Sequence, residues 1–140
     1  MDPTKVYAML REKGMRVTSP KKRILDVFLN NQDRMLSVAD VAALLEGGAA
    51  IDNATVYRNI QKFMELGLLE SFNDERGLKR YTIFQQEHHH YLICTGCGKI
   101  IKIPCEKCFW NTQAQLNDFQ ETHHKLEVYG KCADCAAENN

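Results

Sequence analysis

The 140-residue sequence predicts an α+β fold, with an N-terminal winged helix over residues 1–84 and a small C-terminal α/β domain over residues 85–140. Two observations predict this division. Apolar residues recur at helical spacing up to about residue 66 and then at the spacing of a β-hairpin, which is the element order of a winged helix. All five histidines and all six cysteines lie between residues 88 and 135, so only the second domain offers imidazole or thiolate ligands to a metal.

Three helices are expected in the first fifty residues, each with a recognisable start. The first begins at Asp2 and Pro3, the second at residues 18–20 (TSP) and the third at Ser37, since such residues satisfy the free N–H groups of a helix end. Glycines stop the first and third helices. Helical spacing turns these side chains inward: Val6, Met9, Leu10, Ile24, Leu25, Val27, Phe28, Leu29, Val38, Val41, Leu44 and Leu45.

A fourth helix is expected from Asp52 to about Leu66, followed by strands over residues 68–72 and 79–83. A helix placed before a two-stranded wing occupies the position of a recognition helix, which reads bases in the major groove of DNA. Its outward face carries Asn53, Thr55, Tyr57, Arg58 and Lys62. The alternative is a helix whose polar side chains are merely solvated, with Tyr57 half-buried in packing.

The formal net charge is zero, but residues 11–23 hold six basic side chains and a single acidic one. Such a run indicates either phosphate contacts or a solvated helix face. The sequence has no apolar leader and no long uncharged apolar stretch, so we expect a cytoplasmic protein without a membrane span. In a reducing cytosol, cysteines in C-x-x-C pairs are expected to be metal ligands rather than disulfides.

The second domain is expected to hold strands over residues 91–93, 100–103 and 125–129 and a helix over residues 106–121. Two C-x-x-C pairs can enclose one Zn²⁺ in a closed tetrahedral site. The chain has three such pairs, and spacing alone does not select two of them: Cys94 with Cys97, Cys105 with Cys108, and Cys132 with Cys135.

The histidines indicate a second metal site. His88 and His90 lie two residues apart on an extended segment and point to one face, whereas His89 points away. Together with His124 and one of Cys105 or Cys108, they offer suitable ligands for Zn²⁺ or another divalent transition metal. The alternative is that some of these histidines are surface groups or support the ligands.

Enzymatic chemistry is not expected from this sequence. The segment from Pro104 to Cys108 matches half of the zinc deaminase motif, but the histidine run upstream lacks the required H-x-E glutamate. The chain also lacks H-E-x-x-H and a glycine-rich phosphate loop.

Four motifs in order resemble the ferric uptake regulator family of bacterial metal-sensing repressors: GMRVTSPKKRIL (residues 14–25), ATVYR (54–58), HHHYLICTGCGK (88–99) and YGKCADC (129–135). The resemblance implies a winged-helix DNA-binding domain joined to an α/β dimerisation domain. It further implies homodimers that bind A·T-rich inverted repeats of double-stranded DNA when loaded with metal. The DNA contacts would come from Arg16, Thr55, Tyr57 and Arg58, and the structural zinc ligands would be Cys94, Cys97, Cys132 and Cys135.

The chain departs from the family at its metal sites. The hinge site of the family maps to Met35, Thr82, His89 and Tyr91, and three of these four residues are poor or absent ligands. A second family site maps to His88, His90, Cys108 and His124, with Cys105 as the alternative to Cys108. In that site a thiolate has replaced a carboxylate.

The exchange of a carboxylate for a thiolate favours Zn(II), with Fe(II) as the second possibility. We therefore expect a metal-dependent transcriptional repressor that senses metal inside its dimerisation domain. Two rivals stay open. One is a thiol redox switch that uses Cys105 and Cys108, and the other is a constitutive DNA-binding dimer with structural zinc only.

Overall fold

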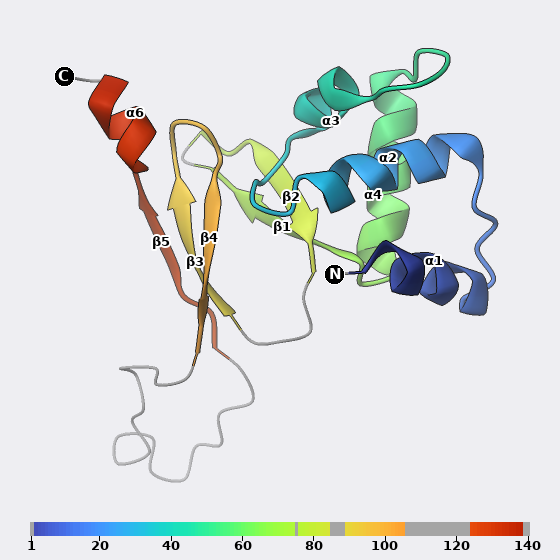
Figure 1. Cartoon of the computed structure of the whole chain (residues 1–140), viewed down its shortest axis with the longest axis horizontal. Coiled ribbons are helices and arrows are strands. Elements are labelled where there is room, and N and C mark those ends of the chain that lie inside the picture. The colour runs from blue at the N-terminus through green and yellow to red at the C-terminus, as the bar shows by residue number, and fades with distance from the viewer. Residues whose placement is uncertain (1, 75, 85–88, 106–123, 139–140) are drawn as a thin grey trace, which may run out of the picture. The chain divides into compact units, whose positions relative to one another are not determined.

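In the computed structural model the chain divides into two compact units, residues 1–85 and 86–140 (Figure 1). The structure describes residues 2–74, 76–84, 89–105 and 124–138. Within these described residues, the first unit holds four helices and a two-stranded sheet, and the second holds a three-stranded sheet and a short helix. The α+β fold class expected from the sequence is confirmed. None of the helices in the described part of the chain is both long and apolar enough to cross a membrane.

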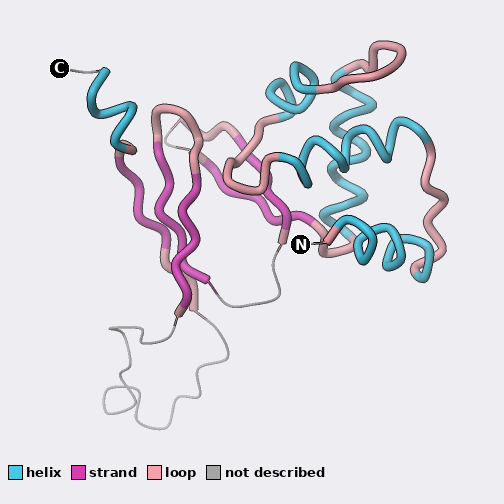
Figure 2. The backbone as a smooth tube through the Cα atoms, viewed as in Figure 1, coloured by secondary structure: helices cyan, strands magenta, loops and turns pink. Residues whose placement is uncertain are grey.

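The four helices of the first unit begin where capping residues predict (Figure 2). They are α1 (Pro3–Glu12), α2 (Ser19–Asn30), α3 (Val38–Leu44) and α4 (Asn53–Glu65). The side chains of Asp2, Thr18, Ser37 and Asp52 each accept a hydrogen bond from a backbone N–H in the first turn. At α3 the cap is reciprocal, because Asp40 also accepts from the backbone N–H of Ser37 at 2.9 Å.

The inward faces of these helices form a single apolar core. Ile24, Leu25, Val56, Ile60 and Phe63 are fully buried in it. Burial on this scale is the main favourable contribution to folding, at about 25 cal/mol for each Å² of apolar surface removed from water. One predicted core position is wrong: Leu44 is 38% exposed. It is the last residue of α3, where the helix ends after only seven residues and the chain turns away.

The wing consists of β1 (Leu69–Asn73) and β2 (Lys79–Ile83), paired antiparallel. Tyr81 also forms an isolated bridge with Leu36, through two backbone hydrogen bonds of 2.8 Å, which joins the wing to the segment before α3. Arg80 strengthens this junction, since it lies 3.3 Å from Asp40 in α3 and 3.5 Å from Asp74 in the wing turn. The wing is therefore attached to the helical core at its base.

The second unit holds β3 (His89–Cys94), β4 (Ile100–Pro104), β5 (Glu127–Gly130) and α6 (Ala133–Glu138). The strand order is β4-β3-β5, with β3 antiparallel to β4 and parallel to β5. A strand next to a parallel partner needs a long crossover connection. The helix predicted over residues 106–121 lies in that connection, outside the described residues. The helix α6, which begins within the last C-x-x-C pair, was not predicted.

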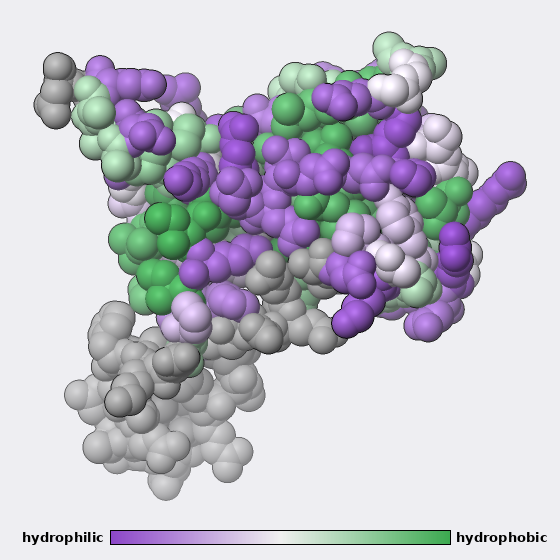
Figure 3. All heavy atoms as spheres, viewed as in Figure 1, coloured by the Kyte–Doolittle hydropathy of each residue, from purple (hydrophilic) through white to green (hydrophobic). Residues whose placement is uncertain are grey.

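One face of this sheet is apolar and open. Leu92 pairs with Ile101 on one side and Val128 on the other, so the three side chains form a row across the strands. Ile101 and Val128 are about half exposed, at 49% and 48%. Figure 3 shows apolar side chains gathered over these strands. The opposite face holds the buried side chains of Tyr91, Ile93 and Ile100.

Candidate metal centres and nucleic-acid interface

The recognition helix α4 presents a polar face to solvent in the first unit. Asp52 caps it by accepting a hydrogen bond from the backbone N–H of Thr55 at 3.0 Å. The Thr55 hydroxyl in turn accepts from the Arg58 guanidinium at 3.2 Å, one helical turn further on. Tyr57 is 50% exposed, so its ring is not buried in the core and can contact a ligand.

A groove runs beside this face, between α4 and the start of α2. Its walls carry three cations from the two helices, one carboxylate, and amide and hydroxyl groups: Thr18, Pro20, Lys21, Thr55, Arg58, Asn59, Gln61, Lys62 and Glu65. Arg16 precedes α2 and is exposed. Such a combination of arginine, lysine, amide and phenol groups on an exposed helix face matches the hydrogen-bonding edges and phosphates of duplex DNA.

Four cysteines gather at one end of the three-stranded sheet: Cys94, Cys97, Cys132 and Cys135. All four Sγ atoms lie within 4.8 Å of one another, and the Sγ atoms of Cys97 and Cys132 are 3.8 Å apart. Tetrahedral zinc with Zn–S bonds of about 2.3 Å requires S···S separations of about 3.8 Å. The donor set and its spacing therefore fit Zn²⁺. Two of the three C-x-x-C motifs can share one metal in three ways, and the fold brings together the first motif and the last motif in the chain.

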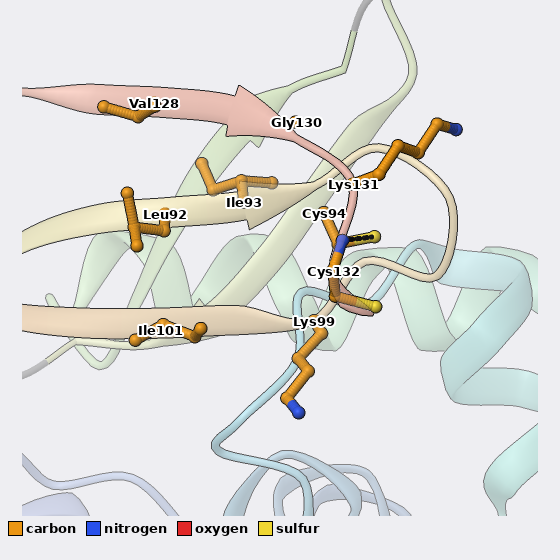
Figure 4. Close-up of a pocket in the computed structure, with 9 residues that line it drawn as sticks. All are labelled: Leu92, Ile93, Cys94, Lys99, Ile101, Val128, Gly130, Lys131 and Cys132. Atoms are coloured by element: carbon orange, nitrogen blue, oxygen red, sulfur yellow. Dashed lines mark hydrogen bonds between the residues drawn. The ribbon is translucent and has the colours of Figure 1, made fainter. Parts of the chain in front are cut away.

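The backbone at this cluster is shaped by two glycines. An added Cβ on Gly96 would lie 2.8 Å from the Cys135 Sγ atom, so only glycine lets the knuckle close over the cluster. Gly98 has φ +77° and donates its N–H to the Cys94 carbonyl at 3.0 Å. Figure 4 shows two members of the cluster, Cys94 and Cys132, and the backbone N–H of Cys132 donates to Cys94 Sγ at 3.3 Å.

These contacts separate the thiol pKa values. Burial raises the pKa of Cys94, but backbone N–H groups of Cys132, Cys97 and Gly96 outweigh burial and lower it to about 6. Hydrogen bonds with the side chains of Cys132 and Cys94 raise the pKa of Cys135 to about 12. Protein groups thus favour a first thiolate at Cys94 but oppose ionisation of the last thiol. A bound cation supplies the charge that lets all four ionise.

A second group lies at the opposite end of the same sheet: His90, Cys105 and His124. One ligand atom from each lies within 4.8 Å of the others. The Cys105 Sγ atom is 3.5 Å from His124 Nε2, and the two imidazole rings have centroids 5.1 Å apart. His90 is buried, at 6% exposure. Two imidazoles and a thiolate are three of the four ligands of a tetrahedral zinc site.

Two residues of the sequence-based ligand set, His88 and Cys108, lie outside the described residues, as does His123. The fold therefore brings together His90 and His124 and adds Cys105, the alternative to Cys108 in the sequence-based ligand set. The strand register contained a signal for Cys105. Ile93 pairs with Ile100 and His89 with Pro104, so a hairpin closed at the cysteine knuckle returns residue 105 to the start of β3.

Met35 and Thr82, the two first-unit residues that the family resemblance placed at a hinge site, carry no imidazole, carboxylate or thiol. Met35 and Thr82 are both buried, at 2% and 1% exposure. Thr82 Oγ1 has no hydrogen-bond partner among the described residues. Both side chains thus belong to the apolar interior.

A winged helix with an exposed polar recognition helix, joined in one chain to a unit with two clusters of metal ligands, defines a metal-binding transcription factor. The ferric uptake regulator family model matches residues 12–129, and the chain belongs to this family. The family is one of metal-responsive transcriptional regulators, and this chain is therefore a metal-dependent transcriptional regulator.

Individual relatives agree along most of the chain. The ferric uptake regulation protein of Neisseria meningitidis serogroup A is 34% identical over 133 residues, which covers 93% of this chain and 92% of the relative. The crystal structure of the Vibrio cholerae ferric uptake regulator matches with a TM-score of 0.68 at 30% identity, covering 88% of this chain and 96% of that one. The Francisella tularensis ferric uptake regulator, solved with iron, matches with a TM-score of 0.72 at 29% identity and the same coverage.

Proposed function

We propose that this protein is a cytoplasmic, non-enzymatic repressor that binds A·T-rich inverted repeats when Zn(II) occupies a sensor site built on His90, Cys105 and His124. The observation that carries the proposal is the meeting of one thiol and two imidazoles at the end of the sheet opposite the four-cysteine cluster. His88 and Cys108 stay candidates for the remaining ligand. Fe(II) is the alternative metal, and the Francisella relative was solved with iron.

We assign a structural role to the four-cysteine cluster and a sensing role to the second group because their metal ligands differ. The cluster of Cys94, Cys97, Cys132 and Cys135 is a closed set of four thiols, which is typical of structural zinc. The sensor group offers two imidazoles and one thiol, one ligand fewer than a closed tetrahedral set, so we expect its loading to be the one that varies with the free metal concentration. β3 carries His90 near its start and Cys94 at its end. Metal at the sensor would join β3 to the segments that follow β4 and precede β5.

Repression follows if this loading changes the spacing of the two recognition helices in a dimer. A palindromic operator requires its half-sites to be matched by both helices at once. The contacts to DNA are assigned to Thr55, Tyr57 and Arg58 of α4 and to Arg16. A coupling of about 1–3 kcal/mol between metal and DNA binding, typical of such linkage, corresponds to a 5- to 150-fold change in affinity.

The test measures binding to the duplex that the wild-type protein selects from a random pool, with and without added Zn(II) or Fe(II). Metal content is determined on the same samples. We expect His90→Ala and Cys105→Ser to keep one tightly bound zinc per chain but to lose the metal response. Cys108→Ser is the matched variant, and its effect decides whether the second thiol of the pair is also a ligand. A metal response unchanged in both His90→Ala and Cys105→Ser would exclude this sensor.

Two rivals predict other outcomes. For a thiol redox switch, oxidation would abolish DNA binding while Zn(II) leaves the Cys105 and Cys108 thiols reactive in a thiol titration. For a constitutive dimer with structural zinc only, operator affinity would be the same with the sensor empty or loaded.

A further inference from the structure

The basic run of residues 11–23 is not one uniform surface for DNA. Several of its cations are committed to groups of the protein itself. Lys22 lies 2.8 Å from the Asp26 carboxylate, Lys13 donates to the Leu66 carbonyl at 3.1 Å, and Lys21 donates to the Arg16 carbonyl at 3.3 Å. Arg23 is the most fully committed, because it donates two hydrogen bonds to one loop.

That loop leads into the recognition helix. The Arg23 Nε atom donates to the Glu46 carbonyl at 3.1 Å, and an Nη atom donates to the Ala49 carbonyl at 2.7 Å. The loop between Leu45 and Asp52 contains no helix or strand, so its own hydrogen bonds do little to define it. A guanidinium has several donors in a rigid fork, which lets one side chain bind two carbonyls in a fixed geometry.

The fit between Arg23 and the loop is close. Gly48 has φ +136°, and a Cβ added there would lie 3.4 Å from both the Cζ and an Nη atom of Arg23. The loop backbone thus lies directly on the guanidinium. The base of the Arg23 side chain is equally fixed, because the next two residues of α2, Ile24 and Leu25, are fully buried.

The consequence concerns where α4 begins. Asp52 caps α4 three residues after Ala49, so the position of the loop sets the position of the cap and of Thr55 behind it. At the far end of α4, Lys13 binds the carbonyl of the C-terminal cap Leu66. Both ends of the recognition helix are thereby tied to side chains from α2 and from the end of α1.

We propose that Arg23 is a positioning residue for DNA recognition, which holds the loop at residues 46–49 and so orients α4, and that it does not contact a DNA phosphate. This inference rests on the proposed role of α4 as the DNA-reading helix. It separates Arg23 from Arg16, which lies in the same basic run, is exposed and is assigned a DNA contact in the proposed function.

Salt dependence distinguishes the two roles. Each phosphate contact contributes about 0.9 to the slope of log affinity against log salt concentration. A positioning residue contributes nothing to that slope but changes how well the base-reading side chains fit. The test compares the full-length wild-type protein with Arg23→Met, Arg23→Lys and Arg16→Gln. The probes are the duplex selected by the wild-type protein from a random pool and a shuffled duplex of the same composition, each titrated at several salt concentrations with the metal that activates the wild type.

We expect Arg23→Met to bind the selected duplex about tenfold more weakly, the size of effect that loss of charged hydrogen bonds produces. Its affinity for the shuffled duplex and its salt slope should be unchanged. Arg23→Lys should resemble Arg23→Met, because an ammonium keeps the charge but not the fork. Arg16→Gln should lower the salt slope on both duplexes. Circular dichroism at the assay temperature confirms that each variant is folded.

A matched pair in the loop tests the same contact from its other side. Gly48→Ala and Gly47→Ala both strain a residue with positive φ, but nothing lies within 4 Å of a Cβ at Gly47. Gly48→Ala should weaken binding to the selected duplex more than Gly47→Ala does, by about as much as Arg23→Met. In the double variant Arg23→Met, Gly48→Ala, the two losses of affinity should not add.

A lowered salt slope in Arg23→Met with recovery in Arg23→Lys would overturn the proposal in favour of a phosphate contact. An affinity for the selected duplex that is unchanged in Arg23→Met would also overturn the proposal, because Arg23 would then contribute only to stability. Failure of the proposed function looks different: Tyr57→Ala and Arg58→Ala would also leave selective DNA binding intact.

Discussion

The Cys105 thiol lies 3.5 Å from Nε2 of His124, although the two residues are nineteen positions apart in the sequence. The contact joins the segment after β4 to the segment before β5 and places both next to His90 of β3. The opposite end of the same three strands carries the four-cysteine cluster. The small sheet thus holds a group of metal ligands at each end.

Gly96→Ala should weaken zinc binding at the four-cysteine cluster about ten- to hundredfold, the range seen when groups around metal ligands are altered. The new methyl group would lie 2.8 Å from Cys135 Sγ and must displace it. Competition with a chromophoric chelator measures the affinity. Gly130→Ala is the control, because nothing lies within 4 Å of its Cβ position, and it should bind zinc as the wild type does.

Removal of zinc should unfold the second unit and leave the first intact. The main apolar core is formed by residues between Val6 and Ile83, all in the first unit. The smaller unit is in the size range where a metal usually supplements the core. Hydrogen exchange with and without a strong chelator checks this. Equal loss of protection in α2 and β3 would contradict it.

Thr82→Val should leave the free energy of unfolding unchanged or raise it by up to about 1 kcal/mol, since a buried hydroxyl without a partner carries its desolvation cost. Thr95→Val is the contrasting change. The Thr95 hydroxyl donates to the Gly130 carbonyl at 3.2 Å, so its loss should destabilise the second unit by about 1 kcal/mol. Urea denaturation measures both variants.

Ser37→Ala should destabilise the first unit by about 1 kcal/mol, because it removes the N-terminal cap of α3. The Ser37 hydroxyl accepts from the backbone N–H of Asp40 at 3.1 Å, and the residue is buried. Ser19→Ala, at an exposed position in the first turn of α2, is the control and should have little effect. A destabilisation equal in the two variants would argue against the capping role.

Asp52→Asn should flatten the acid dependence of stability. Hydrogen bonds from the Thr55 side chain and backbone lower the pKa of the Asp52 carboxyl below its ordinary 3.8. A lowered folded-state pKa adds stability that is present above pH 3.8 and is lost as the pH falls through the folded value. The asparagine side chain can still cap α4 through its oxygen, but it does not ionise, so this contribution to the pH dependence is removed. Urea midpoints between pH 3 and pH 7 test it, with Asp33→Asn as the control.

Much of the fold followed from local rules. Capping residues such as Ser37 and Asp52 set the helix starts, and the inward stripes along α2 and α4 set most of the core. The exceptions lie at element ends. Leu44 is exposed because α3 ends at that residue. The sequence did not predict α6, because this short helix overlaps the last C-x-x-C pair, which was interpreted as metal ligands only. Periodicity needs several turns to be visible, and α6 has fewer than two.

By itself, the sequence determined how the chain divides into two parts: a winged helix whose recognition face includes Tyr57, and a second unit that holds every cysteine and histidine. These follow from composition, periodicity and short motifs, which are local properties. Only the tertiary structure decided which distant groups meet. It selected the first and last cysteine pairs for one cluster, brought Cys105 to His90 and His124, and placed Arg23 of the basic run against the loop before α4. Such pairings depend on strand register and on packing between elements, which no stretch of neighbouring residues encodes alone.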